Sequence, residues 1–253
     1  MKRSRADEKL FWNTRASNYP LPFEKGTYAL TGRILRLLSG MGVSFRQRRI
    51  LDIGCGTGIY ALRLAGQAKR TFGIDSSPEM LKIFRAERRK RGIRNASCSL
   101  SSWKAMPSSR VAGRFDVALA SMTIAIRTKA DVLKMERSAP RCVYIGWAGV
   151  RRNTLLEKVY SEHGIEYKAP EGAAVILRIL KELRRKPQVR FIRDSWEKKA
   201  SPAETLRDIE AALKMNSVKI NRERVENLLN KIARRGLVRQ VTTVRKALIT
   251  WDP

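Results

Sequence analysis

Residues 50–58, with the sequence Ile-Leu-Asp-Ile-Gly-Cys-Gly-Thr-Gly, constrain the fold more than any other part of this chain. The apolar residues Ile50, Leu51 and Ile53 are typical of a buried parallel strand. A helical pattern begins at Ile59, directly after the glycines. We therefore expect a strand–turn–helix unit, which is the building block of a parallel α/β sheet.

Three glycines stand at alternate positions of this turn, at Gly54, Gly56 and Gly58. Without side chains, they allow a sharp turn and a close approach of the backbone to a ligand. A dinucleotide-binding fingerprint would require a small residue at position 59, where this chain has Ile59. That fingerprint also does not include an acid at position 52, where this chain has Asp52. We therefore expect a nucleoside ligand without a pyrophosphate. Asp52 suits a ligand with a cationic end, which it could meet through loop amides or water.

The alternation of strands and helices continues along the chain. Strands are expected near 48–53, 70–74, 95–100, 114–120 and 141–147, with helices near 58–66, 77–91 and 128–137 between them. Such alternation predicts a parallel sheet with right-handed crossovers. Two helices, near 6–16 and 25–38, precede the glycine turn. Beyond Gly149 we expect helices near 153–162, 171–185, 203–215 and 222–235, and strands near 188–193 and 240–250.

Three segments carry a family resemblance: residues 51–58, residues 73–81 (Gly-Ile-Asp-Ser-Ser-Pro-Glu-Met-Leu) and residues 115–121 (Phe-Asp-Val-Ala-Leu-Ala-Ser). In order and spacing they resemble the class I S-adenosylmethionine-dependent methyltransferases of the type 11 and type 25 groups. The resemblance implies a Rossmann-like α/β fold, with a mostly parallel seven-stranded sheet, helices on both faces, an antiparallel last strand and an N-terminal helical lid. It also implies S-adenosylmethionine as the cofactor.

We expect residues 1–253 to form a single methyltransferase domain, because one α/β domain commonly reaches this size. Within it, residues 1–45 would form the N-terminal helical lid and residues 46–150 the cofactor-binding core. Residues 151–253 would form a C-terminal half with substrate-side helices and the last two strands.

Asp75 ends the second expected strand, about twenty residues after the glycine turn, where an acid in this kind of fold bonds ribose hydroxyls. The resemblance implies that Ser76 and Met80 lie near the adenosine, although Met80 could equally be an ordinary core residue of its helix. Ser77 and Pro78 are typical of an N-cap and a first-turn proline, so the next helix should begin immediately after the ribose contact.

The adenine contact departs from the pattern of many relatives, which carry an acid where this chain has Ser102. A serine can accept a hydrogen bond from the adenine amino group, but without the strength that a carboxylate gives. Trp103 could cover the base with its ring, or it could close the core under this loop.

The remaining expectations concern the lid and the fourth strand. Tyr19 follows a segment like the family's Trp-x-x-Arg-Ala-x-x-Tyr, and it would lie over the cofactor or pack the lid helix on the sheet. Ala120, Ser121 and Met122 should border the methionine part of the cofactor and the acceptor pocket, whereas Asp116 should fix the beginning of the strand. The expected cofactor-binding residues are Tyr19, Asp52, Gly54, Cys55, Gly56, Gly58, Asp75, Ser76, Met80, Ser102, Trp103, Ala120 and Ser121.

Methyl transfer from a sulfonium is an in-line displacement, so positioning in a dry pocket supplies much of the acceleration, and no general base is predicted. His163, the only histidine, falls in a glycine-flanked turn and is better explained by a loop role than by proton transfer. Cys55, Cys98 and Cys142 lack metal-ligand spacing, so we expect core thiols and no metal. The charged beginning of the chain has no signal-peptide pattern, which indicates a cytoplasmic protein and no membrane partner.

The net charge is +30, with 53 lysines and arginines against 23 acids. Basic runs occur at residues 85–94, 181–186 and 222–239, and a field of this sign attracts polyanions such as RNA. The chain nevertheless lacks the Asn/Asp-Pro-Pro-Tyr/Phe tetrapeptide and the Pro-Cys or Thr-Cys nucleophile of nucleic-acid methyltransferases. We therefore favour methyl transfer to an N, O or S atom of a small or anionic metabolite. An RNA methyltransferase is the alternative, and a non-catalytic cofactor- or RNA-binding protein is a third possibility.

Overall fold

The computed structural model describes residues 5–214 and 218–253, with the backbone alone for residues 5–8. Residues 1–4 of the expected lid and residue 215 of an expected helix lie outside these ranges. The chain divides into two compact units. Unit 1 comprises residues 1–146, 172–190 and 247–253, and unit 2 comprises residues 147–171 and 191–246. The expectation of a single domain stays a prediction.

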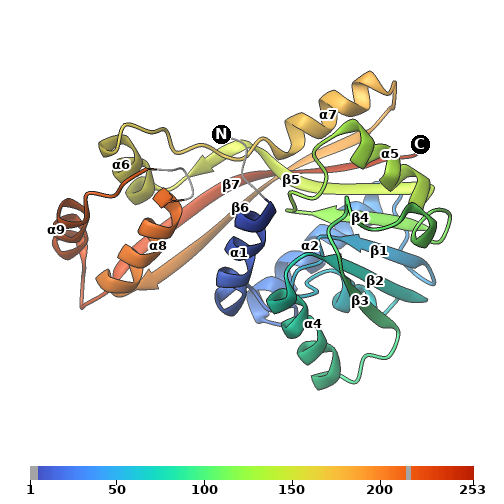
Figure 1. The fold of residues 1–253 in the computed structure, drawn as a ribbon, viewed down its shortest axis with the longest axis horizontal. Helices are drawn as coiled ribbons and strands as arrows, with labels where there is room; N and C mark the ends of the chain where they lie inside the picture. The colour runs from blue at the N-terminus through green and yellow to red at the C-terminus, as the bar shows by residue number, and fades with distance from the viewer. Residues whose placement is uncertain (1–4, 215–217) are drawn as a thin grey trace. The chain divides into compact units, whose positions relative to one another are not determined.

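A seven-stranded sheet with the order β3-β2-β1-β4-β5-β7-β6 forms the framework (Figure 1). The strands are β1 (Arg49–Ile53), β2 (Arg70–Asp75), β3 (Ala96–Leu100), β4 (Val117–Ser121), β5 (Arg141–Arg152), β6 (Gln188–Ala200) and β7 (Val238–Trp251). Strands β1 to β5 pair in parallel, whereas β7 is antiparallel. The predicted fold class, a mostly parallel Rossmann-like sheet with an antiparallel last strand, is confirmed.

The helices are α1 (Arg5–Arg15), α2 (Lys25–Gly40), α3 (Ala61–Leu64), α4 (Pro78–Lys90), α5 (Lys129–Ser138), α6 (Thr154–Glu162), α7 (Gly172–Glu182), α8 (Pro202–Lys214) and α9 (Arg222–Ile232). Short 3₁₀ turns cover Ala16–Asn18 and Ser108–Arg110. The predicted N-cap of α4 is confirmed, because the Ser77 hydroxyl accepts from the Met80 amide and Pro78 occupies the first turn.

Three elements differ in length from the prediction. Helix α3 is shorter than the expected 58–66 helix, because Gly58 has a positive φ of 91° and the chain is still turning there. Strand β5 continues to Arg152, beyond the expected end of this strand at residue 147. Strand β6 extends to Ala200 with mostly exposed side chains, so it lacks the apolar alternation by which a strand is predicted.

Unit 1 places the ends of its parallel strands at a common edge. Ile53 of β1 is level with Ile74 of β2 and with Ala120 of β4. A buried cluster that includes Leu62, Leu81 and Phe84 packs α3 and α4 against the sheet. The loops that leave the carboxyl ends of β1, β2 and β4 therefore converge, as ligand-binding loops do in open α/β sheets.

Unit 2 has its own buried cluster, built from α6, α8, α9 and the beginning of β7. Leu206, Ile209 and Leu213 on α8 and Val225 and Leu229 on α9 are spaced at helical intervals on the buried face of each helix. Among the residues that the structure describes, no helix is long and apolar enough to cross a membrane.

Candidate functional site

A cavity of about 240 Å³ lies in unit 1 at the carboxyl ends of the parallel strands. It contains residues from the lid, from the glycine turn and from the loops after β2, β3 and β4. Nine of the predicted cofactor residues line it: Tyr19, Gly54, Gly56, Asp75, Ser76, Met80, Ser102, Trp103 and Ser121. The structure thus brings together residues that are up to about one hundred positions apart in the sequence.

Asp75 organises the glycine turn from the end of β2. One carboxylate oxygen accepts from the Gly56 amide and the other from the Ser77 amide, both at 2.8 Å. Burial raises the pKa of Asp75, and these backbone bonds oppose that rise by stabilising the charged form. A carboxylate oxygen that accepts one bond retains a second lone pair, so Asp75 can also accept from a ligand hydroxyl.

The glycine turn forms a cradle that side chains would fill. Gly54 has a φ of 72°, and a Cβ there would lie 2.1 Å from the Thr123 hydroxyl oxygen. Gly56 has a φ of 53°, and a Cβ there would lie 3.8 Å from the Tyr19 ring. Because both glycines line the cavity and are bordered by the Asp75 carboxylate, the residues present fit an adenosine ligand with ribose hydroxyls.

Asp52 does not line the cavity. Its side chain is buried beneath the turn, where one carboxylate oxygen accepts from the Ala61 amide at 3.1 Å. Burial raises the pKa of Asp52 to about 7, because few groups compensate for the loss of water around the charge. Asp52 therefore fixes the beginning of α3, and any influence on a cationic ligand would act through the loop.

Cys55, Gly58 and Ala120 also lie outside the cavity wall. Cys55 packs inward, since a Cβ on Gly73 would lie 2.6 Å from its sulfur. A Cβ on Gly58 would lie 2.6 Å from the Phe84 ring, so this glycine permits close packing of the turn on α4. Sequence spacing alone could not separate glycines that face a ligand from those that face the core.

Trp103 forms one wall of the cavity and is also part of the core, with only 2% of its surface exposed. Its indole nitrogen donates to the Asp131 carbonyl at 3.2 Å. The Lys134 ammonium lies 4.6 Å from the centre of the ring and donates to the carbonyls of Trp103 and Met106. The position of Trp103 is therefore compatible with both predicted roles, in which its ring borders the adenine site or closes the core under this loop.

Ser102 lines the same wall, where its hydroxyl oxygen accepts from the Ala105 amide at 3.2 Å. The hydroxyl thus caps a turn while remaining next to the cavity. Tyr19 also lines the cavity, with its ring 6.1 Å from that of Trp12 in an edge-to-face arrangement. Burial raises the pKa of Tyr19, with a smaller contribution from the negative charge of Asp75.

The loop after β4 supplies a part of the wall that sequence analysis predicted only at its beginning, Ser121 and Met122. Met122 adopts a positive φ of 49°, which is uncommon for a residue with a side chain, and its amide donates to the Ile145 carbonyl at 2.7 Å. Thr128 and Asp131 form a capping box at the start of α5, a pattern that could have been read from the sequence. The lining residues that we did not predict are Trp12, Ile74, Ser101, Lys104, Thr123, Ile124, Ala125, Arg127, Thr128 and Asp131.

Neither Asp116 nor His163 lines this cavity. The Asp116 carboxylate accepts from the backbone amide and the guanidinium of Arg49, and these bonds lower the pKa of Asp116. The predicted structural role at the beginning of β4 is therefore confirmed. In unit 2, His163 Nδ1 lies 2.7 Å from the Val159 carbonyl, while Nε2 accepts from the Asn221 amide. Both ring nitrogens are occupied by backbone groups, as expected for a loop histidine.

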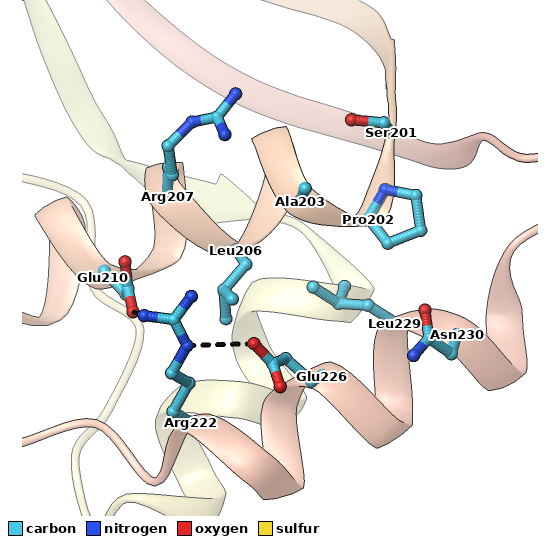
Figure 2. Close-up of a pocket in the computed structure, with 10 residues that line it drawn as sticks. All are labelled: Ser201, Pro202, Ala203, Leu206, Arg207, Glu210, Arg222, Glu226, Leu229 and Asn230. Carbon is cyan, nitrogen blue, oxygen red and sulfur yellow. Dashed lines mark hydrogen bonds and ion pairs between the residues drawn. The ribbon is translucent and has the colours of Figure 1, made fainter.

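A second cavity, of about 600 Å³, lies in unit 2 between α8 and α9 (Figure 2). Figure 2 shows Arg222 between two acids, with nitrogen–oxygen distances of 3.2 Å to Glu210 and 2.9 Å to Glu226. The Arg222–Glu210 pair links α9 to α8, whereas the Arg222–Glu226 pair lies within α9, and together they leave little unbalanced charge in the wall. Among the described residues, no group of three or more histidines, cysteines and acids could hold a metal ion.

Comparison with known proteins identifies the family. The methyltransferase-domain family matches residues 44–232, which is well over half of the chain. An uncharacterized methyltransferase of Schizosaccharomyces pombe, C70.08c, is 47% identical over 36 residues, and this match covers 14% of each chain. The chain thus matches only a small part of that relative's length.

Two solved structures share the fold. A candidate methyltransferase of Bacillus halodurans, BH2331, is 15% identical with a TM-score of 0.53, and the match covers 86% of this chain and 97% of that chain. The DhpI–SAM complex is 17% identical with a TM-score of 0.50, covering 75% and 94%. The family match agrees with the glycine turn, the acid at the end of β2 and the sheet order. The chain belongs to the class I S-adenosylmethionine-dependent methyltransferases.

Proposed function

We propose that this enzyme transfers the methyl group of S-adenosylmethionine to a small, anionic acceptor bound beside the cofactor in the 240 Å³ cavity. The observation that carries the proposal is the convergence of nine sequence-predicted residues on that one cavity. In this arrangement Asp75 accepts from the ribose hydroxyls, and the amides of Gly54 and Gly56 approach the ligand. Met80 and Trp103 flank the adenine, and the Ser102 hydroxyl accepts from its amino group.

The cofactor supplies a methyl group that a sulfonium charge has already activated. The task left to the protein is to hold the acceptor in line with that methyl group and to exclude water. Trp12 and Tyr19, from the N-terminal segment, cover the cavity with two aromatic rings. The loop that begins at Ser121 and Met122 would border the acceptor, because it follows the carboxyl end of β4.

An anionic acceptor is supported by Lys104 and Arg127, the two basic residues in the wall. The two acids of the wall already have other partners. Asp131 accepts from the backbone amides of Arg127 and Thr128, and Asp75 accepts from the glycine turn. Two cationic side chains suit one carboxylate or phosphate group, whereas an RNA track would require a longer row of bases beside the cavity.

The test is transfer of a radiolabelled methyl group from the cofactor into a metabolite extract and, separately, into total RNA. We expect label in an acidic small molecule that an anion-exchange resin retains. Lys104→Gln and Arg127→Gln should then raise the acceptor KM while leaving cofactor affinity unchanged, and Lys129→Gln, on the next helix, serves as the matched control. Label in RNA alone would show that the acceptor assignment is wrong.

A further inference from the structure

The positive charge of this protein is unevenly divided. Unit 1 has 35 lysines and arginines against 12 acids, so it carries +23 of the net +30, and unit 2 carries +7. Several acids of unit 1 are also engaged inside the fold: Asp52 and Asp75 in the glycine turn, Asp116 with Arg49, and Glu136 with Arg185. The unbalanced charge of unit 1 is therefore mainly at its surface.

Much of this charge gathers where the five parallel strands begin. The segments that precede β1 to β5 are residues 46–49, 69–70, 88–94, 110–116 and 137–141, and we call them together the amino-terminal edge. They contain fourteen basic residues and one acid, Asp116. The bases are Arg46, Arg48, Arg49, Lys69, Arg70, Arg88, Arg89, Lys90, Arg91, Arg94, Arg110, Arg114, Arg137 and Arg141.

Backbone hydrogen bonds hold these segments side by side. The Lys69 amide donates to the Arg48 carbonyl, and the Thr71 amide donates to the Asn95 carbonyl. On the other side, the Asp116 amide donates to the Arg49 carbonyl, and the Gly113 amide donates to the Arg137 carbonyl. The order across the sheet is therefore β3, β2, β1, β4 and β5, and four strand spacings of about 4.8 Å give a row about 19 Å long.

The ion pairs of this edge occupy few of its cations. Arg49 bonds Asp116, and Arg141 bonds Asp252 at 2.8 Å. Arg48, Arg70 and Arg94 are exposed, and no ion pair to a described acid is found for them. An exposed row of this length matches about six phosphates of a stacked strand, which has one phosphate per about 3.4 Å along its axis.

The chemistry of the row suits phosphodiesters better than a lipid surface. Twelve of its fourteen bases are arginines, whose planar fork can bond a phosphate through two nitrogens. A membrane-binding surface would also present large apolar side chains for insertion. In the described part of the chain, none of the exposed large apolar residues falls within these five segments.

One end of the row adjoins aromatic rings. The Arg91 guanidinium lies 4.5 Å from the centre of the Phe23 ring, and the Phe23 and Tyr28 rings are 6.3 Å apart. Tyr28 is 47% exposed, although the Arg63 guanidinium lies over one face of its ring, 3.5 Å from the centre. Cationic tracks with an accessible aromatic ring are typical of surfaces that bind single-stranded nucleic acid, because a base can stack on the ring.

We infer that the amino-terminal edge is a docking surface for single-stranded RNA, separate from the methyl-transfer site. The cavity lies at the opposite ends of the same strands, about 16 Å away along a five-residue strand. RNA bound along the edge therefore tethers the enzyme and is not the methyl acceptor. This inference goes beyond the proposed reaction and does not depend on the identity of the small acceptor.

The test measures binding of the full chain to a fluorescein-labelled oligouridine of about 20 nucleotides by anisotropy over a range of salt concentrations. The edge variant combines Arg48→Glu, Arg70→Glu and Arg94→Glu. A control variant with the same net charge of +24 combines Lys214→Glu, Lys231→Glu and Arg235→Glu, which are exposed residues of unit 2. Cofactor affinity, measured by calorimetry on each protein, reports that unit 1 is folded.

The edge variant should lose about tenfold or more in RNA affinity, and its log–log salt slope should fall by about 2, as expected for three lost phosphate contacts on a single strand. The control variant should stay within about threefold of the parent. Equal losses in both variants would overturn the inference, because the binding would then follow net charge alone. It would also be overturned by a parent that binds vesicles with anionic headgroups but not the oligouridine.

If three new carboxylates disturb folding, glutamine variants at the same three edge positions and at the three control positions keep the test valid. The edge glutamine variant should again lose more RNA affinity than the control glutamine variant, although both losses should be smaller. Transfer of label to the small acceptor should be unchanged in the edge variant, so a failure of the docking inference is distinguishable from a failure of the proposed reaction.

Discussion

Replacing Asp75 by asparagine should separate cofactor binding from the packing of the fold. Asparagine keeps the size of the side chain, but it has one acceptor oxygen where Asp75 uses two for the amides of Gly56 and Ser77. One of those amides loses its partner, and a ribose hydroxyl loses a bond to a charged acceptor. A hydrogen bond to a charged group contributes about 1.5–3 kcal/mol, so the Kd for S-adenosylmethionine should rise by about ten- to 150-fold.

The assay is isothermal titration with S-adenosylmethionine and S-adenosylhomocysteine, together with a thermal unfolding curve. Both ligands should lose affinity alike, because both carry the ribose. Asp116→Asn is the matched control, since it removes the same charge at the opposite end of the sheet, where Asp116 bonds Arg49. That variant should lose stability without a change in Kd. A folded Asp75→Asn protein whose Kd stays within about twofold of the parent refutes the assignment of Asp75.

Three further substitutions test other parts of the site. Trp103→Leu should weaken both cofactor forms equally by calorimetry if the ring borders the adenine, and an earlier melting point with normal affinity would assign the ring to the core alone. Burial raises the folded-state pKa of Asp52 from 3.8 to about 7, so the free energy of unfolding should fall by up to about 4 kcal/mol between about pH 4 and pH 7. Urea unfolding of Asp52→Asn should show no such fall. Gly54→Ala should abolish cofactor binding, because its Cβ meets Thr123, whereas Gly42→Ala carries the same positive-φ strain in open space and should cost only about 1 kcal/mol by the same urea assay.

The sequence predicts the cofactor side of the cavity well, because few residues can serve there. A tight turn requires glycines, and a ribose contact at the end of β2 requires an acid, so Gly54, Gly56 and Asp75 are recognisable from spacing. Asp52 and Cys55 follow the same pattern but point under the turn. Which way a side chain faces depends on the backbone φ and ψ of the turn, and residue spacing does not encode them.

Beyond Ser121 and Met122, the loop after β4 was the least predictable part of the wall, and the backbone geometry of Met122 was not predicted either. Met122 adopts its positive φ through a bond to Ile145 on a neighbouring strand, and such a contact leaves no local signature. Strand β6 escaped full prediction for a related reason, since an edge strand with two polar faces has no apolar period. The basic run at residues 85–94 was visible in the sequence, but its place beside the other basic residues of the amino-terminal edge requires the strand order.

Lys134 illustrates how a residue outside the cavity can determine the affinity for its ligand. Its ammonium group bonds two carbonyls of the loop between β3 and β4 and covers one face of Trp103, and burial lowers the pKa of this lysine. The loop is therefore ordered before the cofactor arrives, and its loss of conformational entropy belongs to folding and not to binding. An inherited change at Lys134 would appear as poor saturation with cofactor, although the residue never touches it.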